Sequence, residues 1–87
     1  MDKNKIQELF IANRLPEASA LLIKHAEFGE PWAIYMLGRI AWKEGRNGDA
    51  ISLYERAIAL DPTSEAVVAL EQAREIMDFY NKDLYNP

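Results

Sequence analysis

Residues 31–64 read PWAIYMLGRIAWKEGRNGDAISLYERAIALDPTS, and this segment divides near Gly45 into two stretches of helical length. Ala, Leu, Glu, Lys and Arg are frequent in the chain and β-branched residues are sparse, which favours helices over strands. Gly38 and Ala50 are small where the two helices of a hairpin approach closely, and Tyr54 supplies bulk where they diverge. The segment therefore predicts a helical hairpin.

Breaks of the same kind divide the whole chain, at residues 13–16, 29–31, 45–48 and 61–64. The five segments between them have about 11–17 residues each, which is too long for typical strands. We expect an all-α fold with helices near residues 3–12, 16–28, 32–44, 48–60 and 64–80. Thr63 or Ser64 can cap the last of them. Because the loops are short, neighbouring helices are expected to run antiparallel.

Proline, glycine and asparagine at the breaks support these boundaries. Pro16 and Pro31 fit a first helical turn, where the missing N–H costs nothing. Gly29 and Gly45 can adopt the left-handed conformation that ends a helix, and Asn13 is the next best residue for it. The helices therefore have defined starts and ends in the sequence itself.

The spacing within residues 31–64 resembles the tetratricopeptide repeat. That family has the pattern W-x₂-L-G-x₂-Y, A-x₃-F and P over about 34 residues. The matching residues here are Ile34-x₂-Leu37-Gly38-x₂-Ala41, Ala50-x₃-Tyr54 and Pro62. Gly45 at the turn, Ala57 in the second helix and Asp61 before the proline also match. Large aromatic residues of the pattern are replaced by Ile34 and Ala41, while Trp32 and Trp42 lie one or two residues away.

Residues 1–30 look like a degenerate copy of the same repeat. Asn13 stands at the turn, Ala18 at the first small position and Leu22 at the bulky position, but Ile6 stands where the packing glycine belongs. This substitution predicts that the first two helices are pushed apart or cross at a different angle. Residues 26–38 also look like a Sel-like repeat, a relative with a slightly longer period.

The resemblance implies antiparallel helical hairpins stacked as a short solenoid of about five helices. We expect a single TPR-like domain over residues 1–80, with a degenerate repeat at 1–30, a clear repeat at 31–64, a terminal capping helix at 65–80, and a tail at 81–87 whose role the sequence leaves open. The expected core includes Leu37, Ala41, Ala50, Tyr54, Ala57 and Ile58.

Composition narrows the class of protein. The 87 residues suffice for one hydrophobic core, and the absence of cysteine excludes disulfide staples and thiolate zinc sites. It also favours the cytoplasm, with the periplasm as the alternative. The net charge of −4, with 10 basic residues scattered among 14 acidic ones, argues against nucleic-acid binding. No apolar run has the ~18–20 residues that a membrane span needs.

The sequence shows no catalytic, cofactor-binding or metal-binding set. His25 is the only histidine, and no Gly-x-Ser-x-Gly turn accompanies it. Glu71, Glu75 and Asp78 share one face of a helix, which is typical of a solvated surface rather than a cation site. We therefore expect a non-catalytic protein.

The segment 32–44 carries two distinct faces. The first is apolar, and the second combines aromatic and basic residues and suggests a binding surface. The first holds Ile34, Leu37, Gly38 and Ala41; the second holds Trp32, Tyr35, Arg39, Trp42 and Lys43. In the family that the chain resembles, the first face packs against the hairpin partner and the second lines a concave groove that receives peptides. Alternatively, the first or the last helix covers Trp32 or Trp42.

Neighbouring helices would complete this groove. The first contributes Gln7, Phe10 and Ile11 by family register, and the last contributes Ala66, Ala69, Ala73 and Met77 at i, i+3, i+7 and i+11. Either these alanines leave room for a ligand, or they let the last helix pack onto the tryptophans and close the groove.

Arg39 and Lys43 favour an acidic peptide or protein as the partner. A homo-oligomeric scaffold and an accessory domain of a larger assembly are the alternatives. The partner-binding candidates are therefore Trp32, Tyr35, Arg39, Trp42, Lys43, Phe10, Ala69, Ala73 and Met77.

Overall fold

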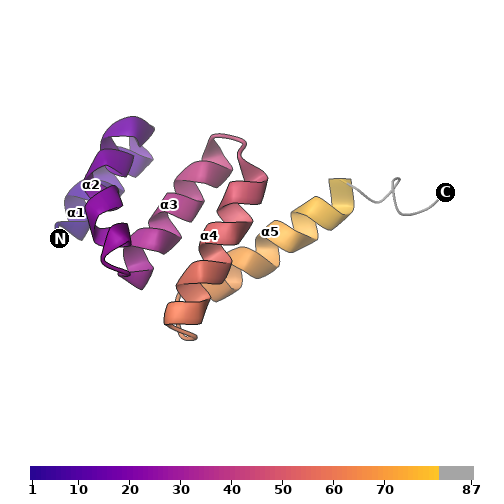
Figure 1. The fold of residues 1–87 in the computed structure, drawn as a ribbon. Coiled ribbons are helices and arrows are strands. Elements are labelled where there is room, and N and C mark those ends of the chain that lie inside the picture. Colours follow the sequence, from indigo (N-terminus) through magenta and orange to yellow (C-terminus); the bar gives the residue numbers. More distant parts are fainter. Residues whose placement is uncertain (81–87) are drawn as a thin grey trace.

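The computed structural model describes residues 1–80, which form five helices placed side by side in chain order (Figure 1). They are α1 (Lys3–Ile11), α2 (Leu15–Glu27), α3 (Pro31–Lys43), α4 (Asn47–Leu60) and α5 (Ala66–Tyr80). Each predicted helix is found, with both ends within two residues of the prediction. The tail at 81–87 lies outside the described residues.

The first three helices end in the same way. Asn13, Gly29 and Gly45 follow α1, α2 and α3 with φ angles of 61°, 79° and 81°, as the sequence predicted. The next N–H in each case reaches back to a carbonyl of the last turn, through the bonds Arg14 to Leu9, Glu30 to His25 and Arg46 to Ala41 at 2.8, 3.1 and 2.8 Å. This is the Schellman arrangement, which satisfies carbonyls that the helix leaves unpaired.

The start of α5 lies two residues later than predicted because the chain first makes a side-chain-bonded turn. The Asp61 carboxylate accepts the Thr63 N–H at 3.0 Å and the Thr63 hydroxyl at 2.7 Å. The Ser64 hydroxyl accepts the Ala66 N–H at 3.1 Å. Ser64 therefore serves the start of α5, whereas Thr63 belongs to the preceding turn.

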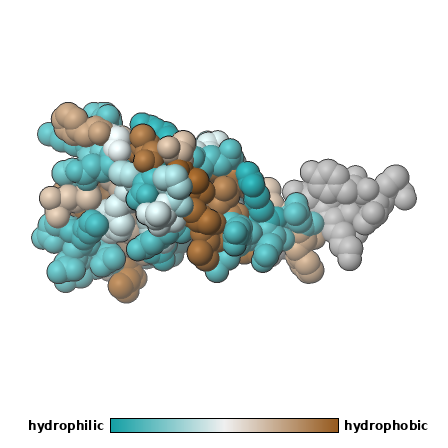
Figure 2. Space-filling view, turned by 90° about the horizontal axis from the view of Figure 1, so that it is seen from below, coloured by the Kyte–Doolittle hydropathy of each residue, from teal (hydrophilic) through white to brown (hydrophobic). Residues whose placement is uncertain are grey.

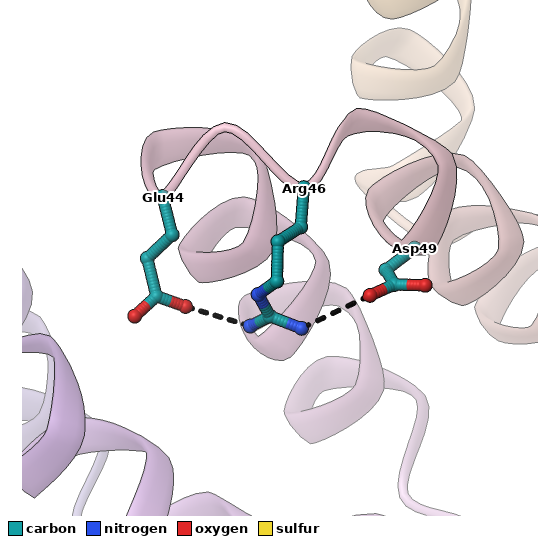
Figure 3. A network of polar contacts seen from close by, with 3 residues as sticks. All are labelled: Glu44, Arg46 and Asp49. Carbon is teal, nitrogen blue, oxygen red and sulfur yellow. Dashed lines mark hydrogen bonds and ion pairs between the residues drawn. The ribbon is translucent and has the colours of Figure 1, made fainter.

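The turn between α3 and α4 carries a small ionic network (Figure 3). The Arg46 guanidinium donates to Glu44 at 2.6 Å and to Asp49 at 3.2 Å, and so links the end of α3 to the first turn of α4. These hydrogen bonds raise the pKa of Arg46, with the bond to Glu44 contributing most. All three side chains are exposed, so the network defines the turn more than it stabilises the fold.

The α3–α4 hairpin is the most extensive helix contact, and it depends on Gly38. A Cβ atom on Gly38 would lie 2.6 Å from Cε1 and 2.7 Å from Cδ1 of Tyr54, and 3.4 Å from the carbonyl oxygen of Ala50. The close approach was predicted, but the assignment of Tyr54 to a diverging part of the hairpin was wrong. The Tyr54 ring lies directly on Gly38, because the missing side chain makes room for it.

The core runs through all five helices. Of the expected core, Ala41, Ala50, Tyr54 and Ala57 are buried. Leu37 and Ile58 are only partly buried and pack against its edge, which corrects the prediction. Helix α2 also packs on α3, which buries a second face of that helix. That face consists of Ala33, Met36 and Ile40, each at most 1% exposed.

The last helix packs on α4 and its far end leaves the array at an angle (Figure 1). Viewed from below, apolar side chains form a band across the middle of the molecule, near the connection between α4 and α5 (Figure 2). The surface on this face therefore has polar ends and an apolar middle.

None of the helices in residues 1–80 is long and apolar enough to cross a membrane.

Candidate functional site: a groove along the third helix

A groove of about 580 Å³ lies along α3, with α5 on one side and α1 at one end. From α3 it is lined by Tyr35, Arg39, Trp42 and Lys43, from α1 by Phe10 and from α4 by Tyr54. The wall on the α5 side consists of Glu65, Val68, Ala69, Gln72, Ala73 and Ile76. Helix α5 packs on α4 rather than on α3, so the groove stays open.

The two cations of the groove are held by the end of α1. The guanidinium of Arg39 lies 4.4 Å from the centre of the Phe10 ring, and the ammonium of Lys43 lies 4.6 Å from it. Lys43 Nζ also donates to the Phe10 carbonyl oxygen at 3.4 Å. Contacts of a cation with an aromatic face contribute about 0.5–1 kcal/mol each at exposed sites. Phe10 therefore positions both charges.

Two tyrosines form the floor next to Arg39. The rings of Tyr35 and Tyr54 have centroids 6.1 Å apart, with their planes inclined by 38°. Burial raises the pKa of the Tyr35 hydroxyl; Arg39 opposes this rise and Glu65 adds to it, through its charge and a side-chain hydrogen bond. Burial also raises the pKa of Tyr54, with a further contribution from Tyr35. Both hydroxyls therefore stay protonated at neutral pH.

Seven of the nine predicted partner-binding residues line this groove: Phe10, Tyr35, Arg39, Trp42, Lys43, Ala69 and Ala73. Trp32 does not. It is partly buried, and the Lys3 ammonium of α1 lies 4.9 Å from the centre of its ring. Trp32 is therefore in contact with α1 through Lys3 and does not line the groove. Trp42 is also partly buried but still reaches the groove.

Met77 lies on a different face of α5. Its sulfur accepts a hydrogen bond from Asn47 Nδ2 of α4 at 3.6 Å. Ala66, Leu70 and Ala73 are also buried on this side. The face that packs on α4 therefore follows spacings of i, i+4, i+7 and i+11, and this rotation turns Ala66 and Met77 away from the groove.

The sequence prediction missed five residues that line the groove, three of them on α5 and the other two Glu65 and Tyr54. Val68, Gln72 and Ile76 line the groove, with Val68 and Ile76 exposed by 57% and 41%. Leu70 was the signal that could have found them, because a large apolar residue between alanines marks the face that packs inward. Glu65 and Tyr54 were not predicted to line the groove, because Glu65 lies beside the expected helix cap and Tyr54 was assigned to the packing of the hairpin.

Helix α1 contributes fewer residues to the groove than the sequence predicted. Only Phe10 of the three predicted residues reaches the groove. Ile11 is 81% exposed and Gln7 is exposed as well, and neither lines it. Helix α1 ends at Ile11, so its last turn meets α3 through one aromatic side chain.

A second, smaller hollow of about 210 Å³ lies between the start of α1 and α2. His25 borders it, with a half-buried side chain and Nδ1 3.7 Å from Glu30 Oε2. Glu71, Glu75 and Asp78 are exposed on α5. Residues 1–80 contain no group of three or more His, Asp or Glu side chains placed to hold a metal ion.

Five antiparallel helices around such a groove define a helical-repeat protein. Residues 31–64 match the family model of the tetratricopeptide repeat, and the five helices in residues 1–80 are consistent with a short TPR-like solenoid. Comparisons with curated proteins and with solved structures gave no match. Tetratricopeptide repeats generally mediate protein–protein interactions and are typically non-catalytic.

Proposed function

We propose that residues 1–80 form one protein-binding domain without catalytic activity, and that it binds an acidic peptide segment in the groove along α3. The observation that carries the proposal is the pair Arg39 and Lys43, which places two cations in an otherwise largely apolar groove. The chain as a whole has a net charge of −4, so this is a local reversal of sign. A local charge of this kind favours carboxylates over other partners.

The size and chemistry of the groove support a peptide as the ligand. Its volume of about 580 Å³ lies within the range of about 300–1,000 Å³ that is typical of pockets for small ligands, so part of a peptide can enter it. Trp42 is partly exposed and offers rigid aromatic surface, which is enriched at protein interfaces, whereas Tyr35 and Tyr54 are largely buried. The wall contains two alanines and therefore leaves room for side chains of a ligand.

Selection from a random peptide library on the immobilised chain tests this function. We expect the selected peptides to be enriched in Asp and Glu. The doubly substituted variant Arg39→Glu with Lys43→Glu should lose binding of these peptides because both carboxylate partners become repulsive. Its circular dichroism should change little, and the loss of stability should stay close to the ~0.5–1 kcal/mol that each lost contact with the Phe10 ring contributes.

A variant with Lys5→Glu and Lys24→Glu is the matched control. It makes the same change in net charge at two exposed lysines outside the groove, and it should bind as the original chain does. Selection without acidic enrichment, or equal affinity in the Arg39/Lys43 variant, contradicts the proposal. Equal loss of binding in the control would assign the effect to net charge instead of to the groove.

Self-association is the second candidate function, because large apolar side chains are exposed outside the groove. Phe28 is 85% exposed at the end of α2. Ile11 and Phe79 are 81% and 75% exposed at the ends of α1 and α5. Light scattering after size exclusion tests this function: a dimer or larger species that Phe28→Ser converts to monomer would support it, and a monomer at every concentration would contradict it.

A further inference from the structure

One polar side chain interrupts the apolar wall that α5 gives to the groove. Within residues 1–80, five α5 side chains line the groove, and among them only Gln72 carries a polar group. Val68 and Ile76 lie one turn before and one turn after it, and they are exposed by 57% and 41%. Residues four positions apart are neighbours on a helix surface. Gln72 is therefore exposed in the middle of an apolar row that faces the groove.

The side-chain amide of Gln72 is free to bind a ligand. It makes no hydrogen bond to any residue of the described part of the chain. The main chain around it offers no further partner, because N–H and C=O groups inside a helix bond to each other. A glutamine amide has two N–H donors and an acceptor oxygen, so it matches both polar groups of a peptide bond.

This free amide favours an extended ligand over a helical one. Main-chain groups of a ligand that lose water against an apolar wall without a new partner lower its affinity. A helical ligand already pairs these groups within itself, and its apolar face would leave Gln72 without a partner. An extended peptide presents unpaired N–H and C=O groups, which Gln72 can satisfy.

The residue spacing on the two walls fits an extended chain. Val68 and Ile76 are separated by roughly 12 Å along α5, which an extended chain spans in about four residues. Arg39 and Lys43 are one turn apart on α3, roughly 6 Å, which corresponds to about two residues of the ligand. Successive side chains of an extended chain point to opposite sides. One such chain can therefore present apolar residues to α5 and acidic residues to α3.

We propose that the groove binds an extended acidic peptide and that Gln72 holds its main chain, through hydrogen bonds of the side-chain amide with one peptide unit. This inference rests on the proposed function and adds the conformation of the ligand and the residue that recognises it. Apolar ligand residues at positions i and i+4 meet Val68 and Ile76, and acidic residues at i+1 and i+3 meet Arg39 and Lys43. Gln72 is a specificity-determining residue, because it distinguishes an extended peptide from a helical one.

A fluorescein-labelled peptide with the sequence Ala-Leu-Glu-Ala-Glu-Leu-Ala and blocked ends tests the proposal by fluorescence anisotropy. Gln72→Leu and Gln72→Ala should each weaken binding about three- to tenfold, the effect of one or two lost hydrogen bonds. Gln7→Leu is the matched control, since Gln7 is an exposed glutamine of α1 outside the groove, and it should bind as the original chain does. Circular dichroism should show the same helix content in all variants, because leucine and alanine favour helices.

The competing explanation of Gln72 is that it only keeps an exposed helix face polar. In that case Gln72→Leu binds the peptide equally or more tightly, because leucine extends the apolar row between Val68 and Ile76. Either result overturns the inference.

N-methylation of the peptide, one residue at a time, removes single N–H donors and gives the reciprocal test. We expect at least one N-methylated peptide to bind the original chain about three- to tenfold more weakly than the parent peptide does, and to lose nothing further in Gln72→Leu. Losses of equal size in both chains would show that no ligand N–H meets Gln72, which overturns the inference.

A second peptide of the same composition tests the conformation. In Glu-Leu-Ala-Ala-Glu-Leu-Ala the glutamates and the leucines stand four positions apart, as on one side of a helix. We expect this peptide to bind at least about threefold more weakly than the first. Tighter binding of the second peptide would show that the groove takes a helical ligand, and would overturn the inference.

Failure of the inference and failure of the proposed function give different results. If Gln72→Leu and Gln72→Ala bind the first peptide as the original chain does, while Arg39→Glu with Lys43→Glu abolishes binding, the groove binds acidic peptides without holding their main chain. If the charge-reversed variant also binds normally, the groove is not the binding site. Absence of measurable binding of the first peptide contradicts the inference alone, because the peptide library still tests the proposed function.

Discussion

The two hairpins fill equivalent positions with different pairs of side chains. In α3–α4 a glycine, Gly38, faces a large ring, Tyr54; in α1–α2 Ile6 and Leu22 stand at the corresponding positions, exposed by only 2% and 0%. The α3–α4 hairpin pairs a glycine with a large aromatic ring, and the α1–α2 hairpin has two side chains of medium size at these positions. Two different pairs of side chains thus fill the two hairpins, and Ile6 in place of a glycine does not prevent burial of the first one.

This comparison also explains where the family pattern is recognisable. The family model matches residues 31–64, which contain the glycine and tyrosine, and not residues 1–30, which have the medium-sized pair. The turn is nevertheless the same after α1 and α3, with a left-handed residue and the same backward hydrogen bond. Turn geometry is therefore retained in the first hairpin, where the packing pair differs.

The largest effect is expected from filling the space of the glycine. Gly38→Leu should lower the free energy of unfolding by roughly 1–3 kcal/mol or more, since its Cβ atom alone would lie 2.6 Å from the Tyr54 ring. Thermal and urea unfolding measure the loss. Gly48→Ala is the control, because a Cβ atom there meets no other atom within 4 Å. An unchanged melting temperature in Gly38→Leu would show that the helix pairing is wrong.

Transplanting the packing pair of the first hairpin into the second sharpens the comparison. Gly38→Ile alone should destabilise the fold, and adding Tyr54→Leu should recover part of the loss because the ring that obstructs the new side chain is removed. We expect a coupling of about 0.5–3 kcal/mol between the two positions, as for residues in contact. Simple additivity of the two effects in a double-mutant cycle would contradict the idea that they form one packing unit.

The turn residues offer a smaller test. Gly45→Ala should destabilise the fold by about 1–2 kcal/mol, because the φ angle of 81° is unfavourable for alanine. Asn13→Gly should change stability by less, since asparagine already tolerates a φ angle of 61°. Chemical unfolding of both variants compares the turns, and a larger effect at Asn13 would show that the first turn is under more strain.

The smallest expected effect concerns the Asp61 turn. Its side-chain and backbone hydrogen bonds with Thr63 lower the pKa of the Asp61 carboxyl. Because the folded pKa lies below the unfolded one, the stabilising contribution is present above the unfolded pKa of about 3.9 and is lost as the pH falls through the folded pKa. Asp61→Asn should therefore flatten the dependence of stability on pH in this acidic range, and an unchanged profile would show that Thr63 does not stabilise the ionised form.

The fold could be predicted almost completely because its signals are local. Glycine, asparagine and proline mark the helix ends, and the small residues of one repeat mark the hairpin. The start of α5 was placed too early because side chains of Asp61 and Ser64 bond the chain into a turn that competes with the helix.

The site was predicted less completely because it depends on how α5 is rotated. Two faces of α5 share Ala66, Ala73 and Met77 and differ only in whether Ala69 or Leu70 is the fourth member. The face with Leu70 is the buried one. The interaction of Glu65 with Tyr35 joins the turn before α5 to α3, and no periodicity within one helix reveals it.

The contacts of Phe10 have a consequence for the thermodynamics of binding at Arg39 and Lys43. Long cationic side chains lose conformational freedom when a ligand fixes them, at a cost of about 0.5–1.5 kcal/mol each. Here Phe10 already holds Arg39 and Lys43 through its ring, and Lys43 also through its carbonyl. The two charges are therefore preorganised for a ligand, because these contacts with α1 already restrict both side chains and less conformational entropy is lost on binding.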